Sequence, residues 1–235
     1  MEPINRPDLT LRQSQNSVVL PKRRSKMRKL IKLIRKYWYV ALALLILILG
    51  LTSWLVIQSS QEAAWERAKD YFTRADYSNA EKELHSMAVP SDADRLHIYA
   101  QTMFATQNLD KSLIAYQKLY ELTKDPSVEL NIGNIYNQQK KYDQAIKVYQ
   151  EMISNNASNI QAYVNLSTVY KLQGNNSEAI KTANNGVIDN PASVILRELQ
   201  VSMVMDNKDS QAYKDAVKEL KELNPSDPLL QALNE

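Results

Sequence analysis

The feature that most constrains the fold is a column of small residues that returns every 32 to 34 positions. A second small column lies twelve residues upstream of the first, and a column of large residues follows that second column by three positions. The first column is Ala80, Ser112, Ala145 and Ala179; the second is Ala68, Ala100, Gly133 and Ser167; the large one is Tyr71, Met103, Tyr136 and Tyr170. A fixed period of this length predicts one supersecondary unit repeated along the chain.

Each repeated unit reads as a pair of helices. Apolar residues recur at spacings of three and four, which is typical of amphipathic helices, and a short polar turn joins two helices of about 12–14 residues. Pro90, Pro126 and Pro191 fall at the ends of units, where a fixed φ and a missing N–H end one helix and begin the next. Small side chains in both columns let the two helices of a unit approach closely. The sequence therefore predicts an all-α solenoid of about five helix pairs.

These columns resemble the tetratricopeptide repeat (TPR) family, which has a period of about 34 residues. The best match is residues 126–159, through Gly133, Tyr136, Ala145 and Tyr149. The expected repeats are 61–92, 93–125, 126–159, 160–193 and 194–224, followed by a C-terminal cap or tail at 225–235. The resemblance implies a right-handed superhelix whose concave side is lined by the first helix of each pair.

In this register a set of mostly polar, amide-rich side chains should face the concave groove. Such side chains suit hydrogen bonding to an extended peptide backbone or to a loop of a partner protein. The alternative is that they are the solvated faces of a purely structural solenoid. The predicted groove residues are His97, Gln101, Asn134, Asn137, Gln138, Asn165, Thr168 and Lys171.

A long apolar segment precedes the repeats. Residues 37–57 contain no charged residue and twelve Leu, Ile or Val, and as a helix they would extend roughly 32 Å, enough to cross the hydrocarbon core. Trp38 near one end and Trp54 near the other suit the membrane interfaces. A buried helix or a cleaved signal peptide are the alternatives, and the length favours an uncleaved transmembrane helix that acts as a signal anchor.

Charge is distributed very unevenly along the chain. The juxtamembrane segment 22–36 contains nine Lys or Arg, whereas residues 58–235 carry 18 Lys or Arg against 24 Asp or Glu. Basic flanks stay on the cytoplasmic side, so we expect a cytoplasmic N-terminus, a single pass, and an extracytoplasmic repeat domain. The basic segment should contact anionic lipid headgroups, and we expect no nucleic-acid partner. Residues 1–21 are expected to be a disordered tail.

The residues usual in catalytic sites are scarce. The chain has no Cys, which excludes disulfides, thiolate metal sites and a cysteine nucleophile. His85 and His97 are the only histidines, and none of the glycine-rich phosphate-binding motifs occurs. We therefore expect no enzymatic activity, no metal site and no cofactor.

These observations favour a membrane-tethered scaffold for protein–protein interaction outside the cytoplasm. The architecture resembles that of accessory proteins in envelope assembly, secretion or pilus formation, which is an analogy at the level of architecture. The alternative is a solenoid that self-associates and has no peptide-binding groove.

Overall fold

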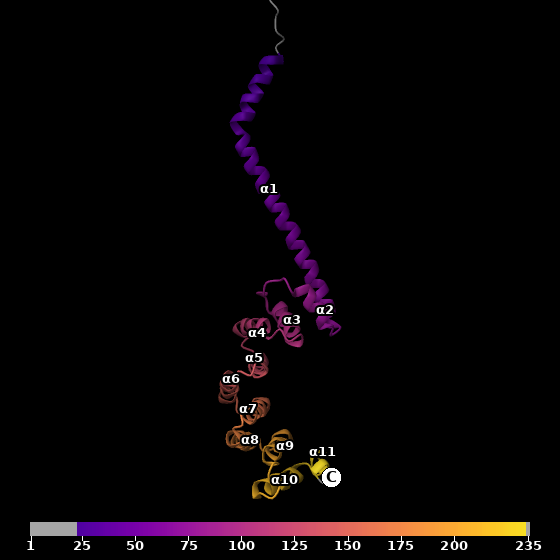
Figure 1. The fold of residues 1–235 in the computed structure, drawn as a ribbon, viewed down its shortest axis with the longest axis vertical. Coiled ribbons are helices and arrows are strands. Elements are labelled where there is room, and N and C mark those ends of the chain that lie inside the picture. The colour runs from indigo at the N-terminus through magenta and orange to yellow at the C-terminus, as the bar shows by residue number, and fades with distance from the viewer. Residues whose placement is uncertain (1–22, 234–235) are drawn as a thin grey trace, which may run out of the picture. The chain divides into compact units, whose positions relative to one another are not determined.

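The computed structural model describes residues 23–233 and divides the chain into two compact units, Met1–Ser60 and Gln61–Glu235. Over the described residues it contains eleven helices and no strand, so the prediction of an all-α fold is confirmed (Figure 1). The predicted disordered tail 1–21 lies outside the described residues. The helices are α1 (Arg23–Thr73), α2 (Tyr77–Leu84), α3 (Ala93–Ala105), α4 (Leu109–Thr123), α5 (Pro126–Gln138), α6 (Tyr142–Asn155), α7 (Ile160–Leu172), α8 (Asn176–Asp189), α9 (Val194–Val204), α10 (Gln211–Leu223) and α11 (Pro228–Leu233).

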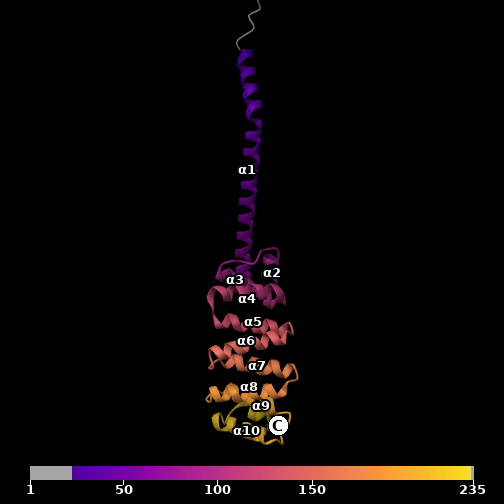
Figure 2. The ribbon, with the colours of Figure 1, turned by 90° about the vertical axis from the view of Figure 1, so that its left-hand side faces the viewer.

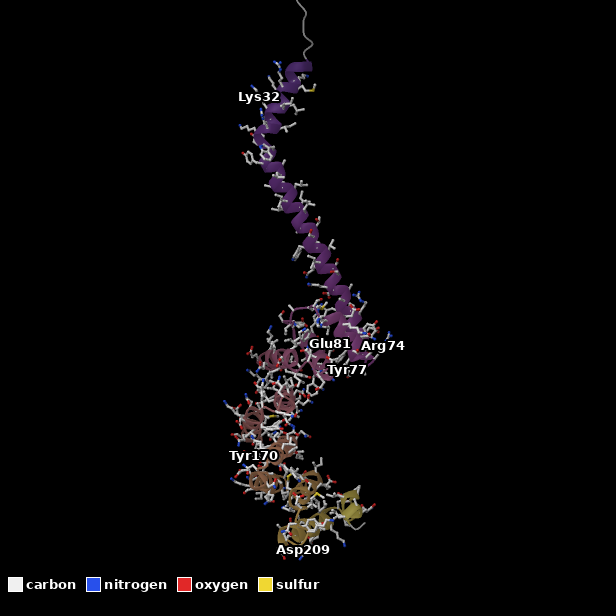
Figure 3. All side chains as sticks on the ribbon, in the orientation of Figure 1. Lys32, Arg74, Tyr77, Glu81, Tyr170 and Asp209 are labelled. Atoms are coloured by element: carbon white, nitrogen blue, oxygen red, sulfur yellow. The ribbon has the colours of Figure 1, made fainter. Side chains whose placement is uncertain are left out.

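The first unit consists, where it is described, of the N-terminal part of α1. Its side chains from Lys26 to Ser60 are all exposed and project on every side of the helix (Figure 3). The most apolar 18-residue window has a mean hydropathy of 2.7, so by length and composition this helix can be a membrane span or a signal sequence. The hydroxyl of Thr52 donates to the Leu49 carbonyl at 3.0 Å, which satisfies a polar group inside the apolar stretch.

The second unit is a stack of five helix pairs. Residues 61–73 of α1 pair with α2 through the Arg67–Glu83 ion pair and the buried contact of Ala68 with the cluster that contains Leu84. The pairs α3–α4, α5–α6, α7–α8 and α9–α10 follow. Figure 1 looks nearly along the helices and shows α3, α5, α7 and α9 as one layer with α4, α6 and α8 as the other. In Figure 2 the same helices run back and forth as successive rods. The prediction of about five helix pairs in a solenoid is confirmed.

Helix α2 is shorter than expected, with only eight residues. It ends at Leu84, and the segment from His85 leads to Pro90, whose ring disfavours a helical conformation in the residue before it. The ammonium of Lys111 donates to the His85 carbonyl at 3.1 Å and takes over one of the acceptors that the helix end leaves unpaired.

The small columns meet where the two helices of a pair cross. Members of both columns are buried, and two hydroxyls bridge them directly: Ser112 donates to the Ala100 carbonyl at 2.8 Å, and Ser167 donates to the Ala179 carbonyl at 2.7 Å. At Gly133 a Cβ atom would lie 2.5 Å from the Tyr149 ring, far inside van der Waals contact. Small residues are required here because backbone and ring occupy the space that a side chain would need.

Four turns between paired helices share one backbone geometry. Ala75, Gln107, Lys140 and Gly174 all have positive φ, from 57° to 78°, and they recur at the repeat interval. The residue after each one donates its N–H to the carbonyl of the large column five positions earlier, at 2.8–2.9 Å, as in a Schellman motif. That same residue is the N-cap of the second helix: Asp76, Asn108, Lys141 and Asn175. One residue thus closes one helix and begins the next.

The left-handed turn position should respond predictably to substitution. A left-handed conformation costs an L-residue about 1–2 kcal/mol, and glycine avoids most of that cost at the expense of a more flexible unfolded chain. We expect Lys140→Gly to increase the free energy of unfolding by about 0.5–1 kcal/mol and Gly174→Ala to decrease it by about 1 kcal/mol. Thermal unfolding of the full chain in detergent, followed by circular dichroism, measures both. Equal shifts of the same sign in the two variants would contradict the turn assignment.

Candidate functional site

All eight predicted groove residues lie on first helices of the stack. His97 and Gln101 are on α3; Asn134, Asn137 and Gln138 are on α5; and Asn165, Thr168 and Lys171 are on α7. His97, Gln138 and Thr168 are exposed and the other five are half-buried, so none is lost in the core.

The structure brings two of them into direct contact. The side-chain carbonyl of Asn134 on α5 accepts a hydrogen bond from the Asn165 amide on α7 at 2.8 Å. It also accepts one from the Tyr149 hydroxyl at 2.8 Å, and Asn165 in turn accepts from the Gln161 amide at 2.8 Å. We call Asn134, Tyr149, Gln161 and Asn165 the amide network. It joins two neighbouring repeats across the first-helix layer.

The direction of these bonds determines what the network can recognise. Both donors point at the Asn134 carbonyl, so the Asn134 amide nitrogen keeps two N–H groups without an acceptor among the described residues. The Asn165 amide donates one N–H to Asn134 and has a second one to offer. The centre of the first-helix layer is therefore rich in donors, which suits carbonyl oxygens of a peptide backbone.

Tyr149 was not predicted as a site residue. It belongs to the second helix α6 and is fully buried, but its ring crosses Gly133 and brings the hydroxyl to Asn134. Burial raises the pKa of Tyr149 to about 12, against a smaller opposing effect of the Asn165 amide. The hydroxyl therefore stays protonated near neutral pH and acts as a fixed donor. The sequence pattern marks Tyr149 only as a large core residue of the second helix, and that is a weak signal for a role in the site.

The remaining predicted groove residues are not part of the network. The ammonium of Lys171 donates to the Ser202 carbonyl on α9 at 3.2 Å, and the Thr168 hydroxyl donates to the Val164 carbonyl within its own helix at 2.7 Å. His97 lies edge-on to Phe72, with 6.5 Å between ring centroids. Gln101, Asn137 and Gln138 make no side-chain hydrogen bond within residues 23–233 and are available to a ligand.

One cavity at the C-terminal end of the stack was not anticipated. It has a volume of about 410 Å³ and is formed by three helices, α7, α9 and α11. Its lining is mostly apolar, in contrast to the amide-rich centre: Val164, Ile195, Glu198, Leu199, Ser202 and Leu229. The repeat pattern does not predict it, because the fifth repeat departs from that pattern and α11 falls outside it.

Within residues 23–233 no group of three or more His, Asp or Glu side chains is placed to hold a metal ion.

Sequence comparison matches residues 133–174 to a family model described as TPR repeat. The chain contains tetratricopeptide repeats. The matched segment includes the C-terminal part of α5, all of α6 and all of α7, and so the whole amide network. No curated protein matches the sequence.

Solved TPR structures share the fold at low sequence identity. A tetratricopeptide repeat protein from Parabacteroides merdae superposes with a TM-score of 0.56 at 18% identity, over 74% of this chain and 70% of that one. MamA from Desulfovibrio magneticus superposes with a TM-score of 0.55 at 14% identity, over 72% of this chain and 97% of that one. MamA AMB-1 superposes with a TM-score of 0.52 at 17% identity, over 74% of this chain and 96% of that one. These likenesses extend the TPR fold from the matched segment to the helical stack.

The amide network can be tested through Tyr149. Tyr149→Phe removes the hydroxyl and leaves the ring against Gly133, so the unfolding free energy should fall by about 1 kcal/mol, the usual net value of one hydrogen bond. The Asn134 side-chain amide signals should also shift and broaden in NMR spectra, because its carbonyl loses one of two donors. Tyr120→Phe is the control, since Tyr120 lies outside the network. Unchanged Asn134 signals in Tyr149→Phe would refute the network.

Proposed function

We propose that this chain is a membrane-tethered TPR scaffold that binds an extended segment or loop of a partner protein. The observation that carries the proposal is the donor-rich amide network on the first-helix layer, flanked by Gln101, Asn137 and Gln138, which have no side-chain hydrogen-bond partner within residues 23–233. Backbone carbonyls are present in every peptide. Such a surface therefore gives affinity for many sequences, and specificity must come from neighbouring contacts.

The tether is the second part of the proposal. Residues 37–57 cross the membrane once, the N-terminus stays in the cytoplasm, and the repeat domain lies outside it. Along residues 26–36 of α1, Met27, Leu30, Ile31 and Ile34 share one side of the helix at spacings of three and four, while the Lys and Arg residues, together with Leu33, occupy the others. This arrangement suits the boundary between acyl chains and anionic headgroups.

Tethering explains how a weak groove can be useful. A partner in the same membrane meets the groove at a high effective concentration, so modest contacts suffice. We infer a non-enzymatic accessory role in envelope assembly, secretion or pilus formation.

Site-specific crosslinking tests the groove. A photoreactive amino acid at Gln138, which is exposed on α5, should crosslink a second protein in intact membranes. Asn134→Ala combined with Asn165→Ala should reduce the yield roughly tenfold, since each lost hydrogen bond contributes about 0.5–1.5 kcal/mol. Asn155→Ala, an exposed residue at the end of α6, is the matched control. Undiminished crosslinking in the double variant would exclude the amide network as the binding site, and adducts only between copies would favour the self-associating solenoid.

The orientation is tested separately. Protease added to intact cells, or to spheroplasts where an outer membrane is present, should digest the repeat domain and spare an epitope placed before Arg23. Disruption of the membrane should expose both. A repeat domain that is digested only after disruption would place it in the cytoplasm.

A further inference from the structure

We propose that the cavity at the C-terminal end of the groove is a selectivity subsite for a peptide that carries an aliphatic side chain and, two positions away, a lysine or arginine. We call it the terminal pocket, formed by Val164, Ile195, Glu198, Leu199, Ser202 and Leu229. The inference rests on the proposed function and specifies which partner sequences the groove prefers.

The terminal pocket has the size and composition of a side-chain site. It is a shallow depression of about 410 Å³ that is open to solvent, so a side chain can lie along it without entering an enclosed cavity. Val164, Leu199 and Leu229 contribute apolar walls from three helices, and Ile195 is 55% exposed. An aliphatic side chain that covers Ile195 would remove apolar surface from water on both partners.

Helix α11 is fixed in place, so the pocket exists before a ligand arrives. The Asp227 carboxylate is buried and accepts hydrogen bonds from the Leu229 N–H and the Asn224 amide, each at 2.9 Å. Leu230 is buried in the core cluster that includes Val201 of α9 and Leu220 of α10. These contacts hold Leu229 at the edge of the pocket.

Glu198 lines the pocket and forms no ion pair within residues 23–233. Arg197, the residue before it, pairs with Glu219. The Lys171 ammonium donates to the carbonyl of Ser202, another lining residue, and forms no ion pair with Glu198 within the described residues. Burial, and then the neighbouring Asp227, raise the pKa of Glu198, so its carboxylate form is less stable than in water. A cation beside it would relieve that cost.

The spacing of the two recognised side chains follows from peptide geometry. In an extended peptide, residues i and i+2 point to the same side, whereas i and i+1 point to opposite sides. Apolar walls and the Glu198 carboxylate belong to one pocket, so an aliphatic residue and a cation two positions apart can use both. The amide network in the centre of the groove would hold the backbone regardless of sequence.

The test uses the full chain in nanodiscs of zwitterionic phosphatidylcholine, which do not attract cationic peptides electrostatically. Three fluorescent peptides share a Gly-Ser-Asn host sequence and differ at two positions: Leu-Ser-Lys, Leu-Ser-Glu and Ser-Ser-Lys. By fluorescence anisotropy, Leu-Ser-Lys should bind about tenfold more tightly than either of the others.

Two variants separate the two preferences. Glu198→Gln should abolish the preference for Lys over Glu and keep the preference for Leu over Ser. Ile195→Ser should abolish the preference for Leu. The matched control is Ile188→Ser, which alters an Ile that is 73% exposed on α8 and should leave all affinities unchanged.

The outcomes distinguish this inference from the proposed function. Equal affinities for the three peptides, or no binding of Leu-Ser-Lys, would overturn the terminal pocket. If the chain binds none of the peptides but self-associates, and Ile195→Ser abolishes that self-association, the pocket binds a second copy of the chain. That result would also overturn the proposed subsite. In each case, crosslinking at Gln138 that depends on Asn134 and Asn165 would leave the groove proposal intact.

Discussion

The close contact between the small columns is the interaction on which the rest of the repeat domain depends. Backbone and small side chains meet there, and the hydroxyls of Ser112 and Ser167 reach carbonyl groups of the partner helix in the same pair. A larger side chain at any of these positions would push the helices of that pair apart. Because each pair packs on the next, that displacement would pass to its neighbours.

The same contact positions the candidate site. Gly133 lets the Tyr149 ring cross α5, and the ring places its hydroxyl on Asn134. Asn134 then fixes Asn165 of the following repeat. A packing requirement in the core is thus converted into an oriented set of donors on the surface, without any additional element.

Much of the fold could be predicted from the sequence because the determinants are local and repeated. The helix pairs follow from the period of small residues, and the mostly polar groove residues follow from the register of the first helices. Their individual roles could not be predicted. Lys171 is engaged with a backbone carbonyl of α9, and Tyr149 acts from a second helix, because both depend on distances between repeats that a single-repeat pattern does not contain. The terminal pocket was missed for a related reason: α11 closes it from outside the periodic part of the chain.

The double role of the turn residues has a consequence for how this domain tolerates changes in length. In the first four repeats the two small columns are always twelve residues apart, and the left-handed residue always lies seven after the upstream column. The interval from a small residue of the second helix (Ala80, Ser112 or Ala145) to the small residue of the next first helix instead grows from 20 to 21 to 22 residues. One residue inserted between the two helices of a pair would disrupt both the C-terminal cap of the first helix and the N-cap of the second. Length variation is therefore confined to the loops that connect one helix pair to the next. Evolution or a protein engineer can lengthen these loops while the pairs stay intact.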